Sequence, residues 1–406
     1  MESKDIFSDI NLDEILDSIN KKDTFAEKWF INYTELDKIQ KEIYEDESCN
    51  FMVKGCAGSG KTILAIHKLY KILAKKDKNF ESYLFTVYTK ALLKFIIDGF
   101  HIFLQENEVD QNLFDFNLNN ANIINIDKIN METLSRKEYL ILDEFQDLDE
   151  KRFEALVSKF NNKMIFGDDE QQLYHKEDAL TVDKVKEIIG EDIKVYELNT
   201  TYRLPFEIAN FCSEIINSSI DKKCKVNHKK GYKPNVIKCP ISNNQNLYFE
   251  YEIDFIVEEI FSKDLKDVAI IVHNRTAAKL ILELVKSKID NIYDEKIRVL
   301  RKKPQINFKI DDNYDKLSFV DKNSITIMVF HSSKGTQFEN VFIPKCDCES
   351  IYSDEFNYDK ALFVACTRTS KNLYITHSKK LTKFISKINT KKFKKYSYNN
   401  GIISEK

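Results

Sequence analysis

The sequence predicts an α/β protein with two domains, each built on a mainly parallel sheet. Its 406 residues allow two or three domains of ordinary size. Short apolar runs that are typical of buried strands alternate with segments of helical periodicity along most of the chain. A glycine-rich turn at residues 55–62, which leads from a strand into a helix, indicates where a ligand would bind.

Composition narrows the class of protein. With 43% hydrophobic and 31% charged residues, the chain has the make-up of a soluble globular protein. A formal net charge of −3 gives no global basic field, so any nucleic-acid contact would need a local basic groove. No apolar run approaches the roughly 18 residues of a membrane span, and no signal segment opens the chain. The eight cysteines include no C-x-x-C pair, so we expect free thiols in a reducing cytoplasm.

The first 35 residues are polar with helix-like spacing and contain no motif. A helix is expected to start within residues 36–40, and it carries Gln40. A glutamine amide offers the donor and the acceptor that are needed to read the edge of an adenine. An ordinary surface glutamine would look the same, but the loop that follows favours base recognition.

The glycine-rich turn has the features of a phosphate-binding loop. A short apolar strand at residues 51–54 precedes it, and a helix follows from Ile63. Glycines let consecutive backbone amides point at phosphate oxygens without a side chain in the way. The loop residues are Gly55, Cys56, Ala57, Gly58, Ser59, Gly60, Lys61 and Thr62. Lys61 would reach the terminal phosphates and the Thr62 hydroxyl would hold Mg²⁺.

The next predicted strand, residues 83–87, ends in Tyr88, Thr89 and Lys90. An aromatic ring, a hydroxyl and a lysine at a strand end suit contact with a nucleic-acid backbone and stacking on a base. The same residues equally suit a solvated surface loop. Both interpretations stay open at this point.

Two adjacent carboxylates follow a third predicted strand, residues 139–142. A parallel sheet presents Mg²⁺-binding and water-activating groups in this way beside a phosphate loop. Asp143 would lie near the metal, and Glu144 would polarise the attacking water. A further strand end at residues 163–166, followed by the polar run 167–174, supports this interpretation over a solvated acidic turn.

The second half repeats the alternation of strands and helices. Strands are expected at residues 194–198, 268–272, 324–330, 341–344 and 373–376, and helices at 206–216 and 248–261. Arg368 follows the apolar helical segment 361–365 and precedes a strand, which favours a position at a sheet edge facing a cleft.

The motifs, taken in order, resemble those of UvrD/Rep-type superfamily 1 helicases. The matching segments are Leu36-x3-Gln40, GCAGSGKT at 55–62, YTKA at 88–91, DEFQD at 143–147, GDDEQQLY at 167–174, LNTTYR at 198–203, HSSKGTQF at 331–338 and VACTR at 364–368. The resemblance covers most of the chain, and eight motifs in one order are far more specific than any one of them.

The resemblance implies two RecA-like P-loop NTPase domains, with ATP in the cleft between them and single-stranded DNA running across both. Gln40 and Tyr202 would then hold the adenine and Gln337 would meet the ribose. Gln171 would sense the γ-phosphate, and Arg203 and Arg368 would reach in from the other side of the cleft. Nucleic-acid contacts would come from Tyr88, Thr89, Lys90, Tyr174, His331 and Ser332.

The chain also departs from this family. The intervals between Lys61 and Asp143 and between Arg203 and Lys334 leave little room for the large insertions of full-length members. Residues 124–127 replace a threonine and histidine, which puts one DNA contact in doubt. The tryptophan usual after the third motif is absent, so Tyr174 or His175 would do any stacking there. A lysine-rich C-terminal end suits either a phosphate-tracking surface or a solvated face.

From these features we expect an ATP- and Mg²⁺-dependent translocase or helicase on single-stranded DNA, of 3′ to 5′ direction by resemblance, in DNA repair or phage defence. The alternative is an ATP-controlled switch or accessory subunit of a nuclease or other protein partner, without processive unwinding. The expected domain limits are 1–35 for an N-terminal helical segment, 36–200 and 201–380 for the two RecA-like domains, and 381–406 for a lysine-rich tail.

Overall fold

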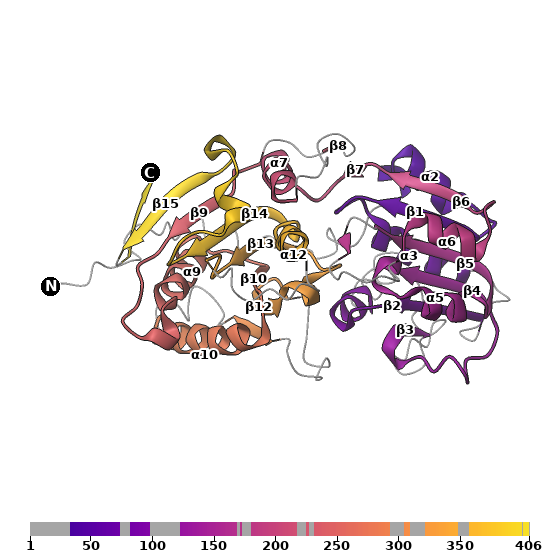
Figure 1. Ribbon diagram of the computed structural model, residues 1–406, viewed down its shortest axis with the longest axis horizontal. Helices are drawn as coiled ribbons and strands as arrows, with labels where there is room; N and C mark the ends of the chain where they lie inside the picture. The colour runs from indigo at the N-terminus through magenta and orange to yellow at the C-terminus, as the bar shows by residue number, and fades with distance from the viewer. Residues whose placement is uncertain are drawn as a thin grey trace.

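The chain folds into two lobes, each centred on one sheet (Figure 1). The computed structural model describes residues 33–73, 82–97, 122–168, 171–172, 180–216, 225–226, 231–292, 304–308, 321–347, 357–399 and 401–405. Of the expected N-terminal segment 1–35, only the short helix η2 (Tyr33–Glu35) falls within these residues. No helix among them is long and apolar enough to cross a membrane.

The first sheet has six parallel strands in the order β3-β2-β4-β5-β1-β6. Its strands are β1 (Phe51–Gly55), β2 (Tyr83–Val87), β3 (Ile123–Asn125), β4 (Lys137–Asp143), β5 (Phe160–Gly167) and β6 (Lys194–Leu198). Its labelled helices are α2 (Lys38–Glu45), α3 (Lys61–Leu73), α5 (Glu150–Val157) and α6 (Val182–Ile189), and residues 90–97 are also helical. The strand expected at 194–198 is thus an edge strand of this first sheet.

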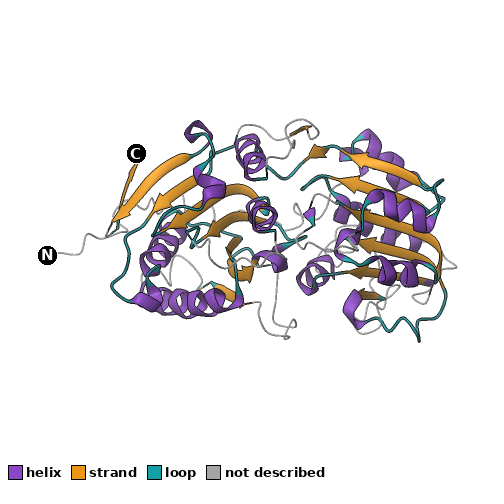
Figure 2. Cartoon of the chain, viewed as in Figure 1, coloured by secondary structure: helices purple, strands orange, loops and turns teal. Residues whose placement is uncertain are grey.

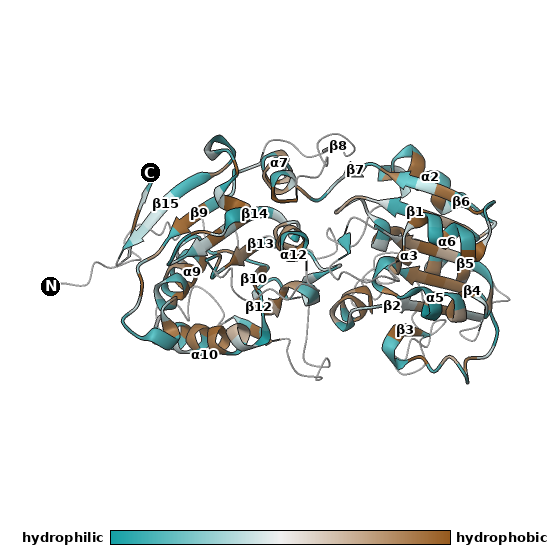
Figure 3. Cartoon of the chain, in the orientation of Figure 1, coloured by the Kyte–Doolittle hydropathy of each residue, from teal (hydrophilic) through white to brown (hydrophobic). Residues whose placement is uncertain are grey.

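The strands of this sheet are apolar on both faces because helices cover both faces (Figure 2). Successive residues of β1 show the alternation: Phe51 and Val53 join one buried cluster, and Met52 joins another on the opposite face. In β2, Phe85 and Leu84 divide in the same way. In the hydropathy colouring, β4 and β5 carry apolar stretches within this sheet (Figure 3).

The second sheet has eight strands in the order β11-β12-β10-β13-β14-β9-β15-β16, and only the β15–β16 pair is antiparallel. Its strands are β9 (Asn235–Lys238), β10 (Val268–Val272), β11 (Gln305–Phe308), β12 (Ser324–Val329), β13 (Phe338–Ile343), β14 (Thr369–His377), β15 (Lys394–Asn399) and β16 (Ile402–Glu405). The helices are α7 (Phe206–Ile215), α9 (Glu250–Ser262), α10 (Arg275–Ile292), α12 (Tyr358–Cys366) and α13 (Lys383–Ser386). A two-stranded pair, β7 (Thr200–Thr201) with β8 (Lys225–Val226), lies between the lobes.

The lysine-rich C-terminal segment is not a separate tail, which corrects one expectation. Strand β15 pairs in parallel with β9 and so extends the second sheet. Lys387 and Lys392 donate hydrogen bonds to backbone carbonyls of α7, and Phe393 packs edge-on against Phe211. Part of the lysine run therefore serves to anchor this segment.

Apolar contacts join the two lobes. One buried cluster contains residues of both sheets, and Gly335 of the second lobe lies against Leu92 of the first. A Cβ on Gly335 would lie 2.5 Å from Leu92 Cδ1, so glycine is required for this approach. The expected fold class, two α/β domains with mainly parallel sheets, is confirmed, while the exact domain limits stay predictions.

Candidate active site

The phosphate loop connects β1 to α3 at the carboxyl edge of the first sheet. Gly58 and Gly60 have φ angles of +76° and +89°, in the left-handed region that glycine adopts without strain. A Cβ on Gly58 would lie 2.6 Å from Arg203 Cβ. Tyr202 N donates to Gly58 O over 2.9 Å, so the segment after β7 holds the loop in place.

The side chains of Lys61 and Thr62 are held by hydrogen bonds near the end of β1 and the end of β4. Lys61 Nζ donates to Gly55 O over 2.6 Å, within its own loop. Thr62 Oγ1 donates to Asp143 Oδ2 over 2.7 Å, which brings the two predicted metal ligands together. Ser59 Oγ is buried and has no hydrogen-bond partner among the described residues.

The acidic pair lies at the end of β4, two strands from β1 in the sheet order. Glu144 has φ 61° and ψ 49°, a left-handed conformation that is uncommon for a residue with a side chain. Gln146 Nε2 donates to Glu144 Oε2 over 2.6 Å, and Gln146 Oε1 accepts from Asp168 N. The chain thus fixes the Glu144 carboxylate from within the first domain.

Burial and neighbouring charges shift the pKa values of the two carboxylates in opposite directions. Burial, followed by the neighbouring charge of Glu144, raises the pKa of Asp143 to about 7. Burial would also raise the pKa of Glu144, but the ammonium groups of Lys334 and Lys61 and the hydrogen bond from Gln146 outweigh it and lower that pKa. Glu144 is therefore ionised at neutral pH.

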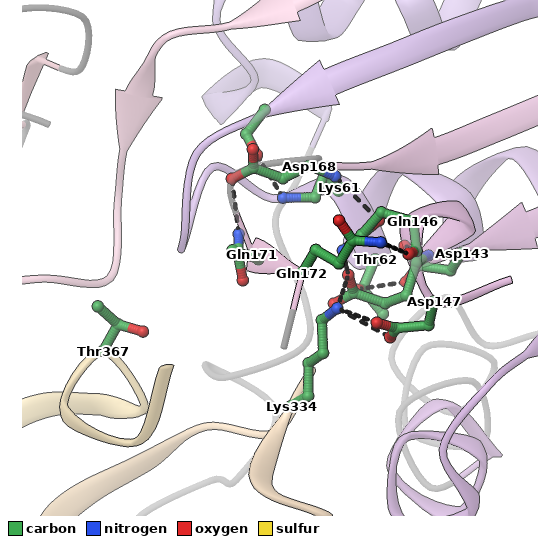
Figure 4. A network of polar contacts seen from close by, with 12 residues as sticks. Lys61, Thr62, Asp143, Gln146, Asp147, Asp168, Gln171, Gln172, Lys334 and Thr367 are labelled. Carbon is green, nitrogen blue, oxygen red and sulfur yellow. Dashed lines mark hydrogen bonds and ion pairs between the residues drawn. The ribbon is translucent and has the colours of Figure 1, made fainter. Parts of the chain in front are cut away.

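Lys334, from the second domain, crosses the cleft to this cluster (Figure 4). Its Nζ lies 2.8 Å from both carboxylate oxygens of Asp147 and 3.7 Å from Glu144 Oε2. Lys334 is 1% exposed. Lys334 lies in the segment 331–338 that resembles a helicase motif, but the sequence pattern assigns it no role, so this contact is a functional candidate that only the fold reveals.

The two predicted cleft arginines approach from the second domain side. Arg203 Nε donates to Gln337 Oε1 over 2.9 Å, and its Nη1 donates to Thr367 O over 3.3 Å. Arg368, between α12 and β14, donates from Nε to Val364 O and from Nη2 to Thr367 Oγ1. All these acceptors are neutral oxygens.

Arg368 is only 2% exposed, and burial lowers its pKa to about 10, so it stays charged at neutral pH. Among the described residues, no carboxylate forms an ion pair with it. A buried guanidinium that is hydrogen-bonded only to neutral oxygens favours an anion as its charge partner.

A cavity of about 170 Å³ lies where these elements meet. Its lining comprises Ala57, Gly58, Ser59, Gly60, Lys61, Thr62, Ile63, Phe95, Glu144, Gln171, Tyr202, Arg203, Gly335, Gln337 and Arg368. Most of the predicted nucleotide-site residues are therefore brought together. Gln40, Gly55, Cys56 and Asp143 lie outside this lining. Ile63, Phe95 and Gly335 line the cavity without having been predicted as site residues.

Gln40 is built into the start of α2. Its Oε1 accepts from Asp37 N over 3.0 Å and completes a capping box, and its Nε2 donates to Ser59 O over 3.1 Å. Tyr202 OH donates to Asp37 Oδ2 over 2.5 Å. The two predicted adenine contacts are thus linked through one helix cap.

Gln171 lines the cavity from beyond the end of β5. Its Nε2 donates to Asp168 Oδ2 over 2.8 Å (Figure 4). Asp168 N in turn donates to Gln146 Oε1, and Gln146 holds Glu144. A chain of hydrogen bonds therefore connects the predicted γ-phosphate sensor with the predicted water-activating carboxylate.

The predicted nucleic-acid contacts lie at strand ends outside the cavity. Tyr88 to Lys90 follow β2, and His331 and Ser332 lie in the short helix η9 (Phe330–Ser333) after β12. Tyr174 lies outside the described residues. Asn125, in the segment that departs from the family, is fully buried and donates to Tyr88 O over 2.6 Å. This asparagine therefore supports the end of β2, a role that only the fold reveals.

A phosphate loop, Glu144 and two arginines line one cavity, Asp143 lies beside Glu144, and two mainly parallel sheets carry these residues; together they define a P-loop NTPase with two RecA-like domains. A family model for the viral superfamily 1 RNA helicase core domain matches residues 51–287, and a model for the UvrD-like helicase C-terminal domain matches residues 305–380. The chain belongs to the superfamily 1 helicases and is UvrD-like in its second half. It is an NTP-hydrolysing enzyme of helicase type.

Among solved structures, the C-terminal domain of a possible DNA helicase from Lactobacillus plantarum WCFS1 is similar, with 18% identity and a TM-score of 0.35. The match covers 48% of this chain and 98% of that one. At that TM-score the likeness carries no conclusion. None of the curated proteins matches the chain.

Proposed function

We propose that the protein is an ATP-dependent translocase or helicase on single-stranded DNA, moving 3′ to 5′ in the manner of UvrD-like enzymes and acting in the cytoplasm in DNA repair or phage defence. One observation carries the proposal. The cavity is lined by the phosphate loop and Glu144 from one domain and by Arg203 and Arg368 from the other side of the cleft. Hydrolysis would therefore depend on how the two domains approach each other.

The loop residues fit a nucleotide and its metal. Gly58 and Gly60 adopt positive φ angles that bare glycine allows in such a loop, and Ser59 Oγ is a buried hydroxyl without a partner among the described residues. Thr62 and Asp143 would hold Mg²⁺, which would supply positive charge to the phosphate oxygens. Lys61 would leave its loop carbonyls for the terminal phosphates.

The remaining residues would divide the chemistry of water attack. Glu144 would orient and deprotonate the water, and Gln171 would sense the γ-phosphate through the chain that leads to Gln146. Arg203 and Arg368 would stabilise charge that develops on the transferred phosphoryl group. Loss of the γ-phosphate would then remove the negative charge that Arg203 and Arg368 contact, and this loss would favour opening of the cleft.

Further contacts are proposed by position. Gln40, Tyr202 and Gln337 would bind the adenosine portion, with Gly55, Cys56 and Ala57 shaping the loop. Single-stranded DNA would cross the strand ends that carry Tyr88, Thr89, Lys90, His331 and Ser332, and Tyr174, outside the described residues, would be a further contact. The carboxyl ends of β2 and β12 lie one in each domain, so a bound strand would feel their relative movement.

One observation favours the second candidate, an ATP-controlled switch that binds a nuclease or other protein partner. Between Arg203 and Lys334, the described strands β9 to β12 all belong to the second sheet. These strands thus belong to the core of the second domain. Among the described residues of this interval, no accessory domain that could separate a duplex is present. Such a switch would hydrolyse ATP without processive movement.

Steady-state ATP hydrolysis separates the two candidates. It would be measured without nucleic acid and with single-stranded DNA of increasing length, duplex DNA and RNA. A translocase predicts stimulation that grows with single-strand length, and displacement of streptavidin from only one end of a biotinylated strand gives the direction. ATP hydrolysis that does not respond to nucleic acid would contradict translocation and favour the switch. Stronger stimulation by RNA than by DNA would identify RNA as the substrate.

A further inference from the structure

A second hollow of about 460 Å³ lies on the second domain, between α7, residues 231–234 and the C-terminal strands. Its lining comprises Glu207, Gly231, Tyr232, Lys233, Thr390, Phe393, Lys394, Lys395 and Glu405, which we call the α7–β15 groove. It shares no residue with the lining of the nucleotide cavity. In Figure 1, α7 and β15 lie along the upper side of the second lobe.

The groove is firmly built. Gly231 N donates to Glu207 Oε2 over 2.7 Å, and a Cβ on Gly231 would lie 2.2 Å from Pro205 Cβ. One wall therefore packs directly on the start of α7. On the other wall, Lys394 N donates to Pro234 O over 2.9 Å, and Phe393 is 5% exposed. The shape of the groove thus follows from backbone pairing and a buried aromatic side chain.

The side chains that face solvent around this frame include three lysines and a tyrosine, besides Thr390 and Glu405. Lys233, Lys394 and Lys395 are exposed, and none forms an ion pair within the described part of the chain. This distinguishes them from Lys371 and Lys392, which pair with Glu339 and Glu214.

Tyr232 is 69% exposed at the rim of the groove. Two carboxylates also line it: that of Glu207 accepts from the backbone of Gly231, and Glu405 is exposed on β16. The lining therefore keeps one more positive than negative charge, with one carboxylate already engaged.

We propose that the α7–β15 groove is a second binding site for single-stranded nucleic acid, in which the three lysines contact phosphates and Tyr232 stacks on a base. Cationic side chains track a phosphodiester backbone, and an exposed aromatic ring stacks only on a base that is free of a duplex. This chemistry selects a single strand over a duplex. The inference rests on the proposed action on nucleic acid and adds a separate contact to it.

The position of the groove gives the site a consequence for the nucleotide cleft. Pro205, on which Gly231 packs, follows Arg203 by two residues. A strand held between residues 231–234 and β15 would therefore restrain the segment that carries a cleft arginine. A longer strand, which reaches both sites, would bind more tightly than a shorter one.

The test uses the full chain and fluorescein-labelled oligo-dT of increasing length, with anisotropy measured over a range of salt concentrations. The variants are Lys233→Gln/Lys394→Gln/Lys395→Gln and Tyr232→Ala, and the control is Lys151→Gln, an exposed lysine on α5 of the first domain. Loss of three phosphate contacts should make the slope of log K against log salt shallower by about 2. Tyr232→Ala should weaken binding of long strands on the order of tenfold.

The outcomes separate this inference from the proposed function. ATP hydrolysis without nucleic acid should be unchanged in all variants, because every changed side chain is exposed and outside the cleft. If wild-type protein binds long oligo-dT but the triple variant matches it in affinity and salt slope, the groove site is refuted and the proposed function stands. If wild-type protein binds no oligonucleotide, both fail. If poly-glutamate competes with oligo-dT as well as unlabelled oligo-dT does, the groove is a general polyanion-binding surface, and the proposed nucleic-acid site is refuted.

Discussion

The two walls of the nucleotide cleft are built differently. On the first-domain wall, the functional side chains are held by their own domain: Thr62 by Asp143, and Glu144 by Gln146. The second wall presents cations, and Lys334 finds its carboxylate partner only across the cleft. The first wall thus positions these side chains from within its own domain, and the second domain adds the ammonium of Lys334, which helps to lower the pKa of Glu144. The second wall needs a negative charge from outside its own domain.

This difference implies that the first wall binds the nucleotide and that the second wall acts in hydrolysis. A wall with preset donors and metal ligands can bind a nucleotide without help. Buried cations on the other wall stabilise an anion only where the domains have closed on it. We therefore expect changes on the first wall to affect binding or the attacking water, and changes of the cations on the second wall to affect hydrolysis with little effect on binding.

Glu144→Gln should have the largest effect within the first wall. The amide keeps the shape of the side chain but cannot accept a proton from water, so hydrolysis should fall by about 10²- to 10⁴-fold. Nucleotide affinity should be retained, as measured by titration with a fluorescent ATP analogue. Turnover at the wild-type rate would remove Glu144 from the role of general base.

The Lys334–Asp147 pair tests whether the walls are coupled. Lys334→Met leaves Asp147 buried without its cation, at a cost to the closed arrangement of about 3–5 kcal/mol. Hydrolysis should fall while ATP binding persists.

Replacing both partners, in Lys334→Met/Asp147→Leu, removes the stranded charge and should restore part of the lost hydrolysis. A double variant no better than Lys334→Met would show that the ammonium itself is needed next to Glu144. If hydrolysis by Lys334→Met equals that of wild type, the walls are not coupled through this pair.

Gly335→Ala tests the close approach of the domains. The residue has φ +78°, and a Cβ would meet Leu92, so the closed cleft should be destabilised by about 1–2 kcal/mol and hydrolysis should fall on the order of tenfold. Leu92→Ala added to Gly335→Ala should give a combined loss smaller than the sum of the single losses. Strict additivity would mean that the two residues do not meet in the active form.

Glu252 provides a comparison outside the cleft. It is fully buried and accepts from Thr376 and Ser378 hydroxyls, and burial followed by the charge of Asp347 raises its pKa to about 7. Because the folded state holds the proton more tightly, the stability from this group is present below about pH 4.5 and is lost as the pH rises to about 7.

Glu252→Gln should remove this pH dependence and stabilise the protein above pH 7 by up to about 3 kcal/mol. Hydrolysis should not change. Urea unfolding across this pH range is the measurement, and Glu187→Gln on the exposed face of α6 is the control. A stability difference that does not vary with pH would contradict the raised pKa.

The central strands and the carboxylates Asp143 and Glu144 were predictable from sequence because buried parallel strands are short apolar runs whose ends carry the chemistry. Gln171, Arg203 and Gln337 were indicated only by the resemblance to the helicase family. The Lys334–Asp147 contact was not, since it joins residues 187 positions apart in different domains. Strand β15 was also missed: in Lys394–Asn399 only Tyr398 is buried, so its polar pattern looked like a tail. Likewise, the hydrogen bond from Gln40 Nε2 to Ser59 O depends on α2 lying beside the phosphate loop.

The most direct test asks whether the second wall acts in hydrolysis and not in binding. The ATP dissociation constant and the single-turnover rate of hydrolysis would be measured for wild type, Arg203→Ala and Arg368→Ala. We predict an almost unchanged dissociation constant and a rate that falls on the order of 10³-fold for either variant. A folding control by thermal unfolding accompanies both, because Arg368 is buried. Folded variants that hydrolyse ATP at the wild-type rate would contradict a cleft completed by the second wall.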